Sequence, residues 1–215
     1  MKFAIVLSGC GVYDGAEIHE ATMTMLAVET NGCRYEMFAP NINQYHVVNH
    51  LTGEVMDESR NVLVESARIA RGNIRALSEY KAAEFNGIIF PGGFGVAKNL
   101  CSYAIDGTEM RIDKIVAGAV RDTHKVGKPI GALCISPIMI AALIPGAEVT
   151  LGSDTKFNSE VKTLGGKHKT TENRQMVVDT KNRIVTTPCY MNNATIADIA
   201  EGADMLVKKL IELAR

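Results

Sequence analysis

The hydrophobic residues of this chain fall into short continuous runs that alternate with longer amphipathic stretches. Residues 2–9, 86–93 and 129–133 are almost entirely apolar, and the first two runs end in glycines. Short apolar runs of this kind are typical of parallel strands that are buried on both faces. Residues 17–31 and 113–128 instead carry apolar positions at helical spacing, which predicts two amphipathic helices.

The remaining segments continue this alternation. Residues 33–40 predict a strand closed by a proline, 57–72 a helix with Asp57 as its N-cap, and 135–143 a second helix. Residues 41–56 are polar and have no clear period, so we expect an irregular insertion there. The last predicted elements are strands within 147–152 and 176–188 and a long helix within 193–215.

Alternating strands and helices predict an α/β fold, a three-layer sandwich with a mostly parallel sheet between helices. The chain has 215 residues, of which 47% are hydrophobic, and no linker-like segment, so we expect one domain over 1–215 with an insertion around 41–56. Sites in such folds lie at the carboxyl ends of the strands. Three turns meet that condition: residues 8–17, residues 91–95 and the turn at Cys134.

Charge and cysteine content narrow the classes of function. The formal net charge is −1, and no run approaches the ~20 apolar residues of a membrane span, so we expect neither a nucleic-acid nor a membrane partner. No CxxC or paired Cys/His spacing indicates a disulfide framework or a metal site. These features predict a cytoplasmic protein without metal. The five cysteines are Cys10, Cys33, Cys101, Cys134 and Cys189.

The glycine-rich turns give little support for a nucleotide site. SGCGVYDG (8–15) spaces its glycines as GxGxxxG, one residue longer than the dinucleotide fingerprint, and GGFGVAK (92–98) has Lys98 where the third glycine belongs. No GxxxxGK[ST] motif is present. We therefore expect no cofactor.

Cys134 lies between a predicted buried strand and a predicted helix, in PIGALCISP (129–137). A reactive residue on a sharp strand-to-helix turn is the nucleophile-elbow arrangement, in which free amides and the helix dipole favour a thiolate. The pattern matches the GxSxG elbow only in part, because Ser136 replaces the trailing glycine. From these residues alone, a nucleophile and a buried core cysteine remain equal alternatives.

Several motifs in order along the chain resemble the ThiJ/PfpI superfamily, the class I glutamine amidotransferase-like fold, whose architecture is flavodoxin-like. They most resemble its subgroup of isoprenoid biosynthesis proteins with an amidotransferase-like domain, also called the ES-one group or glyoxalase ElbB. The motifs are SGCGVYDGAEIHEA, NHLTGE, ESRNVLVESARIARG, PGGFGVAKNL, GKPIGALCISP and IVTTPCYM.

The resemblance implies roles for particular residues. Cys134 would be the nucleophile, Glu17 the acidic residue that hydrogen-bonds the thiol, and Gly93 with Ile135 the backbone of an oxyanion hole. Gly92 would line the site. Simpler interpretations stay open: Glu17 as a first-turn helix acid, and the two glycines as residues needed only by the turn.

Cys10 lies in the first site loop and could approach Cys134, although a structural role is simpler. The chain departs from two enzyme patterns of the superfamily. It has no late His-x-Glu pair, and Ile135 rather than histidine follows the cysteine. Amide hydrolysis needs a proton for the leaving amine, so glutaminase and peptidase activities are not expected.

A nucleophile, an acidic residue and oxyanion donors suit a glutathione-independent glyoxalase. This is an enzyme of hydro-lyase type that converts small dicarbonyls such as glyoxal into hydroxy acids. The alternatives are a non-enzymatic redox or stress-response module that senses oxidation at Cys134, and an accessory protein of isoprenoid metabolism. The expected partners are a small aldehyde or dicarbonyl substrate and a second copy of the chain. The homodimer rests on the resemblance and on the apolar face of helix 17–31.

Overall fold

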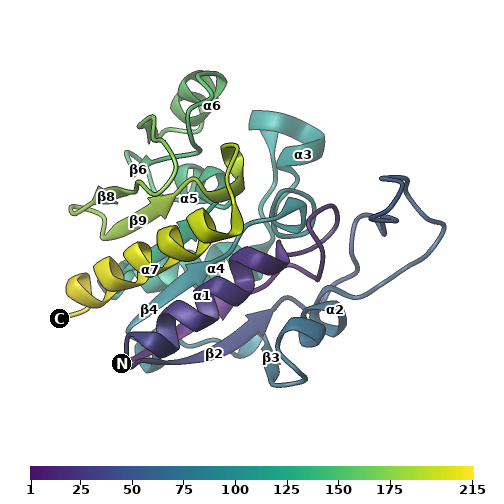
Figure 1. Cartoon of the computed structure of the whole chain (residues 1–215), viewed down its shortest axis with the longest axis horizontal. Coiled ribbons are helices and arrows are strands. Elements are labelled where there is room, and N and C mark those ends of the chain that lie inside the picture. The colour runs from purple at the N-terminus through teal and green to yellow at the C-terminus, as the bar shows by residue number, and fades with distance from the viewer.

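Seven strands form one central sheet in the computed structural model, which describes all 215 residues (Figure 1). They are β1 (Lys2–Val6), β2 (Arg34–Ala39), β3 (Ile74–Ala76), β4 (Gly87–Phe90), β5 (Ile130–Leu133), β8 (Val177–Asp179) and β9 (Ile184–Thr187). The order is β3–β2–β1–β4–β5–β9–β8, and only β8 and β9 pair antiparallel. A small parallel sheet joins β6 (Glu148–Val149) to β7 (Lys167–His168).

Helices cover both faces of the central sheet. The α-helices are α1 (Ile18–Thr30), α2 (Val62–Ile69), α3 (Tyr103–Asp106), α4 (Lys114–Lys125), α5 (Pro137–Leu143), α6 (Lys156–Thr163) and α7 (Ile196–Leu213). The helices α1 and α7 run side by side across one face (Figure 1), and α4 and α5 pack against the other. This arrangement confirms the predicted three-layer α/β sandwich. None of the helices combines the length and the hydrophobicity needed to cross a membrane.

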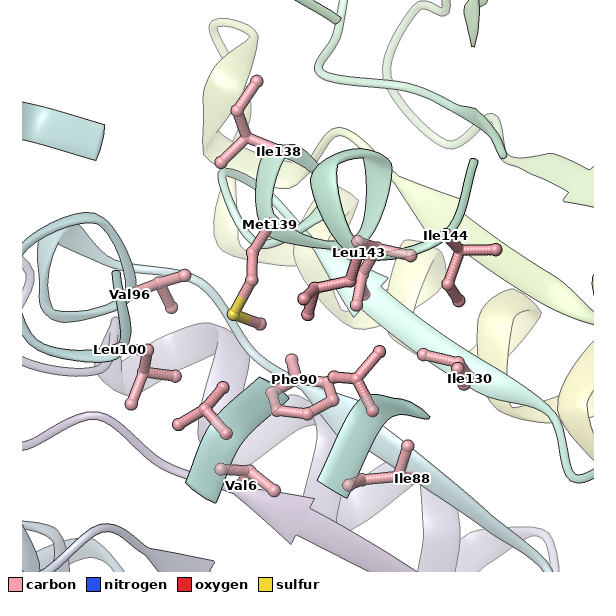
Figure 2. Close-up of a cluster of buried hydrophobic side chains, with 14 of the residues drawn as sticks. Val6, Ile88, Phe90, Val96, Leu100, Ile130, Ile138, Met139, Leu143 and Ile144 are labelled. Carbon is pink, nitrogen blue, oxygen red and sulfur yellow. The ribbon is translucent and has the colours of Figure 1, made fainter. Parts of the chain in front are cut away.

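The strands are buried on both faces, as their unbroken apolar sequences predict. Side chains alternate across a sheet, so Phe3 and Ile5 of β1 pack under α1 and α7, whereas Ala4 and Val6 pack under α4 and α5. Figure 2 shows the second cluster, in which strand residues face Met139 and its neighbours on α5. Its labelled strand residues are Val6, Ile88, Phe90 and Ile130.

Helix α2 begins four residues later than the sequence predicts. Asn61, not Asp57, is its N-cap, and the Asn61 side chain accepts a hydrogen bond from Val64 N–H at 3.1 Å. The preceding residues are held extended against the insertion, because Gln44 N–H donates to the Arg60 carbonyl oxygen at 2.8 Å. Those pairings occupy the backbone groups that an earlier helix start would need.

The insertion around residues 41–56 forms no helix or strand, only isolated bridges, yet hydrogen bonds fix it to the first strand loop. Asp14 Oδ2 accepts from Val48 N–H at 2.7 Å. Asn99, in the π-helix Val96–Leu100, accepts from Tyr45 N–H at 2.8 Å. The same Asn99 side chain donates to the carbonyl oxygens of Ser8 and Asp14, each at 2.9 Å. Three segments distant in sequence therefore meet at one amide group.

Candidate active site

Cys134 occupies a tight turn between β5 and α5. Its φ is +57°, a left-handed conformation that is unfavourable for a residue with a side chain. The turn is held because Cys134 N–H donates to the Thr187 carbonyl oxygen at 3.0 Å, while Pro137 opens α5. The side chain is 8% exposed. The cysteine therefore has the strained placement expected of a nucleophile elbow.

Two backbone amides point at the sulfur atom of Cys134. They belong to Gly93 and Ile135, and their hydrogen bonds favour a negative charge on the sulfur. Gly92 allows this close approach, since a Cβ atom there would lie 2.4 Å from Cys134 Cβ and 2.6 Å from Glu20 Oε2. The structure thus brings Gly92, Gly93 and Ile135 to the thiol, in positions where the two amides could act as oxyanion donors.

Glu20 is the carboxyl group that contacts the thiol. Its side chain is fully buried and hydrogen-bonded to Cys134, and its Oε2 accepts from Gly92 N–H at 2.9 Å. Its Oε1 lies 3.4 Å from Tyr190 N–H. Burial, with the nearby Glu17 carboxylate, raises the pKa of Glu20 to about 8. Glu20 and Cys134 therefore form a buried acid–thiol pair whose titrations are coupled.

The expected hydrogen bond from Glu17 to the thiol is absent from the structure. Glu17 is the N-cap of α1, and its Oε2 accepts from Glu20 N–H at 2.7 Å. Residues three apart on a helix share one face, so the backbone turns Glu20 toward Cys134 and leaves Glu17 at the helix end. Glu17 nonetheless lines the cavity into which Cys134 opens. The sequence placed the acid in the right loop but one helical turn too early.

The acidity of the thiol also differs from the prediction. Burial is the main cause that raises the pKa of Cys134 well above its usual range, and the charge of Glu20 adds to it. The amides of Gly93 and Ile135 act in the opposite direction without overcoming burial. At neutral pH the pair therefore retains its protons, so the expected lowering of the thiol pKa by the turn is wrong.

Two other cysteines near the strand ends differ in their relation to Cys134. Cys10 does not line the cavity of Cys134, and the charges that act on its thiol come from Glu65, Arg68 and Asp14 on the opposite side of its loop. The prediction that Cys10 lines the site is therefore wrong, because its loop turns it toward α2. Cys189, which follows β9, is buried beside the backbone N–H of Cys134.

A cavity of about 340 Å³ opens above Cys134. Most of its wall is apolar, and its ionisable groups, apart from the thiol and two tyrosines, are Glu17 and Lys156. Its other lining residues are Val12, Gly93, Phe94, Ala97, Tyr103, Ala104, Ile135, Phe157, Tyr190 and Met191. A thiol, two amides and a carboxylate thus face a mostly apolar space, the composition typical of small-molecule sites.

Histidine and metal ligands are missing from this cavity. The nearest histidine to its wall is His19, whose Nδ1 lies 2.9 Å from the Tyr190 hydroxyl and 3.9 Å from Glu17 Oε1. No group of three or more His, Cys, Asp or Glu side chains in the chain could hold a metal ion. The cavity therefore offers a thiol, a carboxylate, two tyrosine hydroxyls and a lysine ammonium group as side chains that could transfer protons.

The chain resembles curated proteins over almost its full length. It is 43% identical to the human mitochondrial glutamine amidotransferase-like class 1 domain-containing protein 3, over 99% of this chain and 83% of that protein. The chain belongs to the ES1 family of glutamine amidotransferase-like proteins. Two further ES1 family members are the rat ES1 protein homolog, 44% identical over 99% of the chain and 84% of that protein, and the zebrafish ES1 protein, 36% identical over 88% and 77%. No family model matches the sequence.

Solved structures that share the fold of this chain include proteins named for DJ-1 and ThiJ/PfpI. The isoprenoid biosynthesis protein with amidotransferase-like domain from Ehrlichia chaffeensis is 37% identical, with a TM-score of 0.94 over the whole of both chains. Glyoxalase III from Candida albicans has a TM-score of 0.64 at 14% identity, over 99% of this chain and 97% of that one. This second likeness shows the fold alone. The resemblance predicted from the sequence motifs is confirmed.

The cytoplasmic location expected from the sequence is contradicted by these relatives. All three curated ES1 family proteins are named as mitochondrial. The mitochondrial matrix is also a reducing compartment, so scattered free cysteines do not separate it from the cytosol.

Proposed function

We propose that this protein is a cysteine-dependent, glutathione-independent glyoxalase-type enzyme that converts a dicarbonyl into a hydroxy acid. The observation that carries the proposal is the buried Glu20–Cys134 pair, which opens with two amides onto a cavity that also contains Glu17. Nucleophile, proton acceptor and oxyanion donors are the parts that this chemistry requires.

In the first step, the sulfur of Cys134 adds to one aldehyde carbon of glyoxal. The thiol proton passes to the ionised carboxylate of Glu20, and the new oxyanion is stabilised by the amides of Gly93 and Ile135. This step needs the pair in its singly deprotonated state. Because the pKa of Glu20 is raised to about 8, the reactive fraction grows as the pH rises toward that value.

In the second step, the Glu17 carboxylate removes the proton from the carbon bonded to sulfur and returns it to the neighbouring carbon. The enediol between these transfers becomes a thioester of Cys134. Water then cleaves the thioester, which releases glycolate and restores the thiol. Glyoxal and one water molecule account for every atom of the product. Glu17 takes the acid–base role in this step, while Glu20 takes the contact with the thiol that the resemblance implied for Glu17.

The test is glycolate formation from glyoxal in deuterium oxide without any added thiol, followed by NMR. We expect turnover by the wild type, none by Cys134→Ala, and glycolate that carries solvent deuterium on carbon, since an enediol exchanges its proton. Absence of turnover in the wild type would overturn the proposal. Glycolate without carbon-bound deuterium would show that the hydrogen moves between the two carbons without exchange with solvent, either by direct return from Glu17 or by a hydride shift.

The redox alternative has weaker physical support. Peroxide reacts with thiolates, and burial raises the pKa of Cys134, so little thiolate is present at neutral pH. If peroxide oxidised Cys134 rapidly at pH 7 while glyoxal was not turned over, the sensing role would replace the enzymatic one.

A further inference from the structure

The cavity above Cys134 is much larger than the smallest dicarbonyl. It encloses about 340 Å³, whereas a water molecule occupies about 30 Å³ of liquid, so glyoxal would fill only a minor part. Cavities of about 300 Å³ and above bind ligands with a substantial apolar body. A substrate as small as glyoxal would leave most of the apolar wall unused.

The reactive groups gather at one end of this cavity. Cys134 belongs to the buried cluster beneath α1 and α7, and Phe157 belongs to the cluster beneath α4 and α5. Ile135 and Met191 pack against both clusters and line the cavity between them. The space therefore runs from the thiol toward a wall made by Phe157 and its neighbours.

That distant wall presents aromatic faces and few free polar atoms. Phe157 is 3% exposed on the first turn of α6. Phe94, which follows Gly93 and lines the same cavity nearer the thiol, is 49% exposed. Tyr103 of α3 donates its hydroxyl to Glu160 of α6, which leaves its ring for the cavity. In Figure 1 the two helices stand near each other at the upper edge of the molecule.

The cationic side chain on this wall is Lys156, and it already interacts with other groups of the protein. Lys156 Nζ lies 3.3 Å from Asp154 Oδ2 and 4.8 Å from the centre of the Phe157 ring. An anionic substituent would have to compete with Asp154 for it, whereas an aromatic group would meet Phe94, Phe157 and Tyr103 without losing a hydrogen bond.

We propose that the substrate of this site is a 2-oxoaldehyde that bears an aromatic or branched apolar substituent, an inference that rests on the proposed glyoxalase-type function. The aldehyde carbon reacts at Cys134, and the substituent packs against Phe94, Phe157 and Tyr103. Water adds as in the proposed mechanism, so phenylglyoxal, used as a probe, would give mandelate.

The first measurement compares kcat/KM for phenylglyoxal and glyoxal. We expect at least a tenfold preference for phenylglyoxal in the wild type, since even one extra methylene group in an apolar pocket changes kcat/KM by about 10–200-fold. Phe94→Ala, which removes a half-exposed ring and should fold normally, is expected to lower the preference severalfold, and Phe157→Leu should lower it further. Tyr45→Ala removes an exposed ring outside the cavity and should leave the preference unchanged.

The second measurement is calorimetric binding of mandelate and glycolate, the two products, to the wild-type protein. We expect mandelate to bind at least tenfold more tightly, and this readout does not depend on turnover. Tighter mandelate binding without any dicarbonyl turnover would contradict the proposed enzymatic function but support the inference that the cavity binds ligands with an aromatic substituent. Equal rates and equal affinities for the two compounds, with glyoxal turned over, would overturn the inference while leaving the enzyme.

Discussion

The turns that follow β5 and β9 lie next to each other and carry the same residue in the same unusual conformation. Cys134 has a φ of +57° and Cys189 a φ of +47°, and both thiols are buried with a raised pKa. Only Cys134 receives the amides of Gly93 and Ile135, contacts a carboxyl group and opens onto the cavity.

This contrast shows that a strained cysteine at a strand end does not make a site. The carboxyl group comes from α1 and one amide from Gly93, which follows β4, whereas the second amide belongs to Ile135 in the turn of Cys134 itself. No such pair of amides acts on the thiol of Cys189. The Cys189 thiol packs against the backbone N–H of Cys134 and thereby supports the turn that carries Cys134. The difference between the two turns can be tested one residue at a time.

The largest effect should come from removing each thiol by substitution of the cysteine with alanine. We expect Cys134→Ala to abolish dicarbonyl turnover and the iodoacetamide label at position 134, since it removes the nucleophile, while Cys10 stays available for labelling. Cys189→Ala should keep turnover within about threefold and lose about 1 kcal/mol of stability through a small cavity. Kinetics and urea unfolding of both variants provide the measurement. Equal losses of turnover would erase the distinction between the two turns.

The next effect separates the two roles assigned to Glu17. Glu17→Gln keeps an N-cap acceptor but cannot carry a proton, so turnover should fall about a hundredfold or more while stability stays near that of the wild type. Glu17→Ala should lose turnover and also about 1 kcal/mol of stability, because the N-cap is removed. The measurements are the stability of each variant in urea and its kinetics with glyoxal. Near-normal turnover in Glu17→Gln would leave Glu17 with the role of helix cap only.

A third effect concerns pH and the buried pair. The folded-state pKa of Glu20 is about 8 and the usual value is 4.5, so between these values the folded protein holds a proton that the unfolded chain has released. Wild-type stability should therefore fall as the pH rises from 5 to 8, by on the order of a few kcal/mol.

Glu20→Gln is neutral in both states and should be much less sensitive to pH over that window. Urea unfolding at several pH values gives the comparison. Parallel pH dependence in the two proteins would mean that Glu20 is ionised in the fold. In the wild type, turnover should rise toward pH 8 together with ionisation of the pair.

The smallest effect tests the glycine that lets β4 approach Cys134. A methyl group at Gly92 would overlap Cys134 Cβ and Glu20 Oε2, so Gly92→Ala should cost about 2 kcal/mol and separate the pair. Gly118→Ala is the matched control, because a Cβ at this α4 position meets nothing within 4 Å. It should stabilise the protein slightly. If thermal unfolding shows equal changes in stability for the two variants, the close approach of Gly92 to Cys134 does not affect the stability of the protein.

The sequence predicts most of the fold because unbroken apolar runs and glycine turns identify buried parallel strands. It also locates Cys134, Gly92 and Gly93, since all three follow such strands directly. It does not predict the π-helix Val96–Leu100 or the short helix α3, whose few residues have no resolvable period. Ala97, Tyr103 and Ala104 of those elements line the cavity, so its full extent could not be foreseen.

The error over the acidic residue has a clear physical source. Glu17 and Glu20 lie in the same predicted helix, and the acid nearer the helix start was the natural choice. The decisive signal is the buried face of α1, where Glu20 shares helical spacing with Thr24 and Ala27. A carboxyl group on that face must be neutral or paired. The thiol pKa was misjudged because a sequence does not show how much burial outweighs two amides.

The Asn99 side chain has a consequence for how the molecule moves. Because one amide holds the insertion, the first strand loop and the π-helix together, loosening any of these segments would also release the other two. The irregular arm around residues 41–56 should thus exchange its Tyr45 and Val48 amide hydrogens slowly, like a core element, despite having no regular structure. A binding event on that arm would act on Ser8 and Asp14, and through their loop on Val12 and Glu17 at the edge of the cavity above Cys134.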